Sequence, residues 1–275
     1  MGWVDQTPLW IIGLFCLVVL ITAHEFGYRA GRRFVPRDGH TDAKSYLVSS
    51  AISLSSLMMA FTFGAAQTDF RLRQGLVSTE ANAIGTAYLR IQTLEQPARD
   101  QLSLRLLRYA RVRGAFYSAT GHPAQLSLND ADTSRQQAEI WTAVSDLVRT
   151  NPTPTLNGPL LQSVNAMFDA AESRVAAQDI RVPPAVLLML VITGVVSAAL
   201  IGFAGSGGRR YSVIIVAVLI IQIMAFCLIL GLDRPDATTV KISQRPLDRA
   251  IAEINQNEAP RGNLRQPQAE PTPLP

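Results

Sequence analysis

Hydrophobic residues are gathered in four long runs along this chain, and polar residues separate the runs. Each run has about 20 residues, enough for a helix to cross the roughly 30 Å hydrocarbon layer of a bilayer. The runs are residues 8–26, 45–66, 183–205 and 211–232. The pattern predicts four membrane-spanning helices, arranged as one hairpin in residues 1–66 and a second in residues 182–232.

The first run has the length of a retained span, but a secretory signal also begins with an apolar run. A signal peptide carries positive charge before its apolar core and ends at a small-residue cleavage site. Here the preceding stretch MGWVDQT contains no Lys or Arg, and no such cleavage site precedes HEFGYRAGRR. These features favour a retained span.

Residues 67–181, between the second and third runs, show apolar positions at helical spacing, and no stretch alternates long enough to predict a strand. Breaks near Glu95, Thr120 and Asn151 divide this region into four predicted helices. The fold class is therefore all-α, with a helical extramembrane domain between the two hairpins. The apolar positions at helical spacing are Leu76, Ala81, Ile84, Tyr88, Ile91, Leu102, Leu106, Tyr109, Phe116, Ile140, Trp141, Val144, Leu147, Leu160, Val164, Met167, Phe168, Ala171 and Val175.

The C-terminal segment, residues 233–275, is polar throughout. From about residue 255 it contains too few large apolar residues to offset the entropy lost on ordering. We therefore expect disorder from that point.

Composition agrees with a membrane protein, since 48% of the 275 residues are hydrophobic and 17% are charged. The net charge is +4, but the basic residues are spread over every polar segment and form no patch with aromatic residues, so nucleic acid is not a predicted partner. Cys16 and Cys227 both lie inside apolar runs. They therefore offer the polar regions neither a disulfide nor a thiolate metal site.

No motif predicts an enzyme. His24 and Glu25 match the first half of a zinc-protease helix motif, but Tyr28 stands where the second histidine is needed, so these residues are better explained as the interfacial end of the first span. His40 and His122 lie in Gly- and Pro-rich loops. A phosphate-binding loop and a nucleophile elbow are also missing from the sequence. We expect no catalytic, cofactor or metal site.

The second span carries a stripe of small and hydroxyl residues on one helical face. Such a stripe commonly allows helices to approach closely, and the alternative is a polar pathway lined by hydroxyl groups. The stripe consists of Ser49, Ser53, Ser56, Ala60 and Phe63, which we take as the candidate pore-lining residues.

Three motifs occur in order along the chain: EANAIGTAYLR from Glu80, NAMFDAAESR from Asn165 and LDRP from Leu232. With them, the stretch from about Trp10 to Leu247 resembles the bacterial DUF4239 family, also called the bestrophin-like domain family. The polar residues at its motif positions are Glu80, Asn82, Arg90, Asn165, Asp169, Arg174, Asp233 and Arg234.

The resemblance implies a homo-oligomeric, pentameric anion channel in the bacterial inner membrane, with the bilayer, ions and further copies as partners. A non-conducting scaffold or sensor, which binds a partner through its helical domain, is the alternative. We further expect Glu80, Arg90, Asn165, Asp169 and Arg174 to form polar contacts that tie the first and fourth domain helices together, because an unpaired charge between packed helices is costly.

The distribution of positive charge predicts how the chain is oriented in the membrane. Basic residues follow the first span but do not precede it, and Arg209 and Arg210 lie in the other short loop. Loops 29–44 and 206–210 are therefore predicted to be cytoplasmic. The resemblance implies the opposite orientation.

Overall fold

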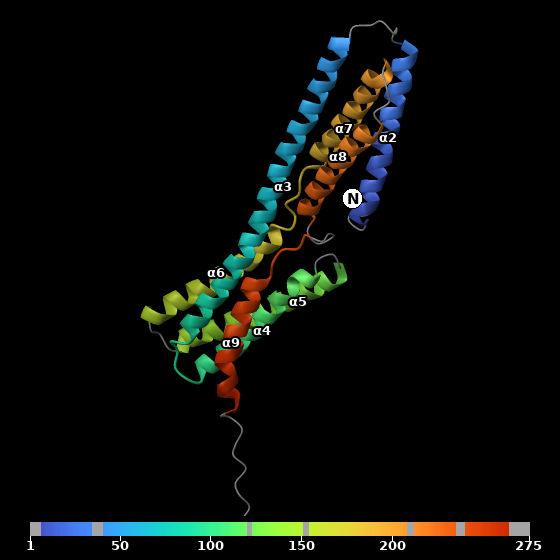
Figure 1. Ribbon diagram of the computed structural model, residues 1–275. Helices are drawn as coiled ribbons and strands as arrows, with labels where there is room; N and C mark the ends of the chain where they lie inside the picture. Colours follow the sequence, from blue (N-terminus) through green and yellow to red (C-terminus); the bar gives the residue numbers. More distant parts are fainter. Residues whose placement is uncertain are drawn as a thin grey trace, which may run out of the picture. The chain divides into compact units, whose positions relative to one another are not determined.

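The computed structural model describes residues 7–34, 41–119, 123–150, 154–207, 212–234 and 240–263 (Figure 1). Every regular element in these ranges is a helix, which confirms the all-α fold class. The elements are α2 (Leu9–Phe34), α3 (Thr41–Ile91), α4 (Ala98–Ala119), α5 (Pro123–Thr150), α6 (Pro154–Ala176), α7 (Pro184–Ala204), the short 3-10 helix η1 (Gly205–Gly207), α8 (Ser212–Asp233) and α9 (Arg245–Asn263). His40, His122 and residues 264–275 lie outside the described ranges.

The chain divides into two compact units. The membrane unit contains Met1–Arg71 and Ile180–Lys241, and the helical unit contains Leu72–Asp179 and Ile242–Pro275, so α3 contributes to both. Within the described ranges, four helices, α2, α3, α7 and α8, are long and apolar enough to cross a membrane. They correspond to the four spans predicted from the sequence.

Glycines allow α2 and α7 of the membrane unit to pack closely. A Cβ added to Gly27 would lie 1.9 Å from the backbone oxygen of Ala199, and one added to Gly202 would lie 2.0 Å from the backbone oxygen of His24. No side chain fits at such distances. The small residues in these two helices therefore permit backbone-to-backbone contact, as is common in membrane helix pairs.

The membrane unit's apolar core includes Leu190, Phe226 and Ile229. Near it, the start of α7 is fixed by Asp233, whose carboxylate accepts a hydrogen bond of 2.8 Å from the backbone N–H of Val182. Asp233 is 1% exposed. This motif residue therefore satisfies a backbone donor just before a helix that Pro184 begins.

The helical unit buries most of the apolar positions that the periodicity predicts. Ile84, Leu106, Phe116 and Met167 are fully buried, for example, whereas Trp141 is 43% exposed. Val175 also lies at the surface. The exposed positions show that helical spacing identifies a stripe but not the edge at which its burial ends.

Two predicted boundaries are wrong. The sequence places a break from Thr120 to about residue 132, but α5 begins at Pro123 and includes that stretch. Proline lacks the N–H that the first turn leaves unpaired, so here it begins a helix.

The prediction of disorder from about residue 255 is also wrong for the residues up to Asn263, because α9 continues to that residue. Ile254 is buried, the Tyr88 hydroxyl donates to Glu258 at 2.9 Å, and Arg111 donates to Asn255 at 2.9 Å. Contacts with distant parts of the chain thus order a segment whose own composition is too polar to do so.

Candidate functional site

The predicted pore-lining stripe lies on the surface of the membrane unit. Ser49, Ser53, Ser56, Ala60 and Phe63 of α3 are all exposed in the single chain. Ser55 and Thr62 of the same helix are 4% and 3% exposed. The hydroxyl-bearing stripe is therefore left uncovered by the other helices of its own chain.

The opposite face of α3 is tied to its neighbours by polar contacts. Gln222 of α8 donates to the Ser55 hydroxyl at 3.1 Å, and the Ser197 hydroxyl of α7 donates to the backbone oxygen of Ala51 at 3.0 Å. Hydrogen bonds of this kind hold helices together where lipid offers no partner. They determine which face of α3 packs inside the unit.

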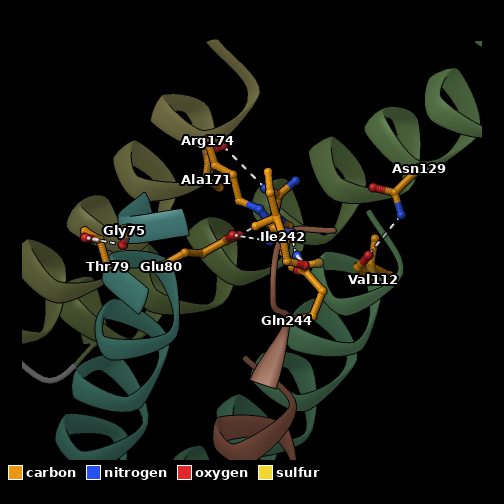
Figure 2. A network of polar contacts seen from close by, with 10 residues as sticks. Gly75, Thr79, Glu80, Val112, Asn129, Ala171, Arg174, Ile242 and Gln244 are labelled. Atoms are coloured by element: carbon orange, nitrogen blue, oxygen red, sulfur yellow. Dashed lines mark hydrogen bonds and ion pairs between the residues drawn. The ribbon is translucent and has the colours of Figure 1, made fainter. Parts of the chain in front are cut away.

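A buried ionic cluster lies in the helical unit, centred on Glu80 (Figure 2). The Glu80 carboxylate accepts hydrogen bonds from Arg113 of α4 and, at 2.6 Å, from Arg174 of α6. The side chains of Glu80 and Arg113 are 0% exposed, and that of Arg174 is 5% exposed. One carboxylate thus joins three helices that are far apart in the sequence.

Further contacts surround the two guanidinium groups. The Phe116 ring lies 4.5 Å from the Arg113 guanidinium carbon and 5.1 Å from that of Arg174, which is within cation–π range. Arg174 also donates to the Gln244 side-chain oxygen at 2.5 Å, and Gln244 donates to the backbone oxygen of Ile242 at 3.1 Å. The cluster therefore also fixes the segment that leads into α9, as Figure 2 shows.

Burial affects the titration of this region. It lowers the pKa of Arg174 from its usual value, although the Glu80 charge opposes the shift. Burial also raises the pKa of Tyr109 to about 12, against the effect of the Arg113 charge. The Tyr109 hydroxyl therefore stays neutral to a higher pH than an exposed tyrosine does.

The expected contact network is present only in part. Glu80 and Arg174 do join the first and fourth domain helices. Arg90 also joins these two helices, because it donates to the backbone oxygen of Pro159 in α6, apart from the Glu80 cluster. Asn165 instead donates to Asp169 at 2.9 Å on the exposed surface of α6, so this pair does not join the helices.

The remaining motif residues lie elsewhere. Asn82 is exposed on α3. Arg234 lies beside Asp233, with 3.8 Å between the Arg234 Nε and a carboxylate oxygen. The polar residues of the motifs therefore lie in three kinds of place: at the surface, beside the start of α7, and in the buried cluster.

Arg113 is the residue that sequence reasoning missed. It follows Tyr109 by four positions and precedes Phe116 by three, which places it on the apolar stripe of α4. A basic residue at an interior position predicts a buried partner, and the sequence contains that signal.

A family model for the bestrophin-like domain matches residues 13–247. The chain belongs to the bestrophin-like domain family. The match spans both units and includes Glu80, Arg113, Arg174 and Asp233. No protein with a curated description matches the sequence.

Crystal structures of a bacterial bestrophin homolog from Klebsiella pneumoniae are similar to this chain. One, a tryptophan-to-alanine mutant, has a TM-score of 0.69 at 17% identity, covering 91% of this chain and 97% of that chain. A tyrosine-to-alanine mutant has a TM-score of 0.66 at 17% identity, covering 89% and 95%. A structure phased with zinc has a TM-score of 0.64 at 16% identity, covering 89% and 96%. The bestrophin-like chain is therefore a membrane protein with the fold of these homologs.

Proposed function

We propose that this protein assembles into a homo-oligomeric anion channel in the bacterial inner membrane. The stripe of Ser49, Ser53, Ser56, Ala60 and Phe63 on α3 lines the central pathway. Five copies is the number that the family resemblance implies. The observation that carries the proposal is the exposure of the whole stripe in the single chain.

Exposure supports a pathway because the stripe bears hydroxyl groups. A serine hydroxyl that faces lipid finds no hydrogen-bond partner there, whereas one that faces water or an ion can form a hydrogen bond with it. Neighbouring helices of the same chain cover Ser55, Ser197 and Thr62 instead. The hydroxyls of the stripe are thus left free to meet a lumen when copies surround an axis.

Each residue type has a role in this pathway. Serine hydroxyls donate hydrogen bonds to a passing anion, and the Phe63 ring forms an apolar constriction that gates by dewetting. The net charge of +4 favours an anion over a cation near the protein. Positive charge and neutral donors together support anion conduction.

Substitutions in the stripe should change chloride flux from liposomes that contain the purified protein. Phe63→Ala should raise flux several-fold because it widens the constriction, and Ser53→Trp should abolish flux because it fills the lumen. Phe61→Ala and Leu54→Trp are the matched controls. Both control residues are exposed, at 68% and 55%, on other faces of α3, and both should leave flux unchanged.

Equal effects of stripe and control substitutions would show that the stripe does not line the pathway. Flux no greater than that of empty liposomes, across several ions and pH values, would instead favour the non-conducting scaffold. A single-copy protein in mild detergent would favour the scaffold as well, because one chain cannot enclose this pathway.

The basic residues Arg29, Arg32 and Arg33 follow the first span, and none precedes it. We therefore expect loops 29–44 and 206–210 in the cytoplasm and both termini outside it. Alkaline phosphatase fused after Pro275 should be active, because this enzyme matures outside the cytoplasm. If a reporter that becomes fluorescent only in the cytoplasm were fused at the same place and gave fluorescence, the chain would have the opposite orientation.

A further inference from the structure

A cavity of about 260 Å³ lies in the helical unit between α4, α5 and α6. Arg113 lines it from α4, Thr133 and Asp130 line it from α5, and Glu172 lines it from α6. Its size is close to the lower end of ordinary small-molecule pockets, so it can admit a small ligand.

Two of the residues that line the cavity each carry a buried polar atom that lacks a partner among the described residues. Arg113 Nη1 and Thr133 Oγ1 are buried and have no hydrogen-bond partner among the described residues. The exposed fractions of Arg113 and Thr133 are 0% and 7%. Buried polar atoms are nearly always hydrogen-bonded, and an acceptor that entered the cavity would supply the partner that both of these atoms need.

The nearby charges specify what kind of acceptor fits. Glu80 is the carboxylate that both Arg113 and Arg174 contact, which leaves one positive charge in excess within the buried cluster. A ligand carboxylate beside Arg113 would neutralise this excess and accept from the free guanidinium nitrogen. The Thr133 hydroxyl can donate to the same group.

The cavity is also lined by two carboxylates, which are more exposed than Arg113 and Thr133. Asp130 is half-buried and Glu172 is exposed, and both carboxylates line the cavity. They repel a simple anion and attract an ammonium group. One ligand with a carboxylate at one end and an ammonium at the other satisfies both pairs of residues.

We propose that this cavity binds a small zwitterion of the amino-acid class. Its carboxylate is hydrogen-bonded to Arg113 and Thr133, and its ammonium group lies against Asp130 and Glu172. The site is separate from the α3 stripe, so its occupancy can be tested whether or not the protein conducts.

Calorimetry on the full-length protein in mild detergent tests the proposal, with glycine and 5-aminopentanoate as probes. Pentanoate and pentylamine each retain one charged end. At least one zwitterion should bind about tenfold or more tightly than either single-charge compound, since a charge-assisted hydrogen bond contributes about 1.5–3 kcal/mol. Absence of zwitterion binding would overturn the proposal, and so would pentanoate binding of equal affinity, which would indicate a site for anions only.

Two variants test the position of the site. Thr133→Val removes the hydroxyl with little change of shape, and Glu172→Gln removes an exposed carboxylate, so both should fold normally and bind the zwitterion about tenfold more weakly. Glu253→Gln, an exposed carboxylate on α9, is the matched control and should bind as the unmodified protein does. Unchanged affinity in both test variants would place binding elsewhere and contradict the proposal.

Discussion

Replacing Glu80 with alanine should lower the free energy of unfolding by about 3–5 kcal/mol, the cost of leaving buried charges without their partner. The Glu80 carboxylate is the shared acceptor of Arg113 and Arg174, and all three side chains are almost completely buried. Without Glu80, two almost completely buried guanidinium groups would remain close together. The loss of one carboxylate therefore leaves two positive charges unpaired at once.

Thermal unfolding in mild detergent measures this effect. Arg174→Ala should cost less than Glu80→Ala, because Arg113 still pairs with Glu80, and the double variant should lose less than the sum of the single losses. Asp169→Ala, in an exposed contact with Asn165 on α6, is the matched control and should change stability by no more than about 0.5 kcal/mol. If Glu80→Ala unfolded at the temperature of the unmodified protein, the cluster would not stabilise the helical unit.

Replacing Gly27 with alanine should lower stability by about 1–3 kcal/mol, because the added methyl group overpacks the contact between α2 and α7. The new Cβ would lie 1.9 Å from the backbone oxygen of Ala199, and a backbone atom cannot rotate away as a side chain can. Gly202→Ala should act similarly from the other helix, since its Cβ would lie 2.0 Å from the backbone oxygen of His24.

Gly85→Ala is the matched control for the glycine substitutions. Gly85 is also inside a helix, but apart from its own stretch of helix backbone no atom lies within 4 Å of an added Cβ. Alanine should therefore raise stability there by up to about 1 kcal/mol, through its better helix propensity. Opposite shifts in unfolding temperature for Gly27→Ala and Gly85→Ala are the expected result. Shifts of the same sign and size would show that α2 and α7 do not pack through these glycines.

The membrane helices and the shared face of the stripe residues were predictable because each depends on local sequence. A span needs only length and apolar composition, and the face shared by Ser53, Ser56 and Phe63 follows from helical periodicity. Neither inference requires knowledge of which helices are neighbours. Whether copies of the chain surround that face depends on contacts between chains, which periodicity does not describe.

The buried cluster was predictable only in part, because its members are distant in sequence. Glu80 and Arg174 attracted notice as motif residues, but Arg113 lies 33 positions from Glu80 in a region where basic and acidic residues nearly balance. Similarly, α9 is ordered by contacts such as the one between Tyr88 and Glu258, which are 170 positions apart. Composition averages over a segment and therefore cannot detect partners supplied by another part of the chain.

Current across a planar bilayer, recorded with purified protein under a chloride gradient, tests the central claim most directly. An anion channel lined by the α3 stripe should give discrete openings that reverse near the chloride equilibrium potential. Ser53→Trp should abolish the openings, and Leu54→Trp should preserve them. A silent bilayer with correctly folded, oligomeric protein, or currents that Ser53→Trp leaves unchanged, would contradict the account.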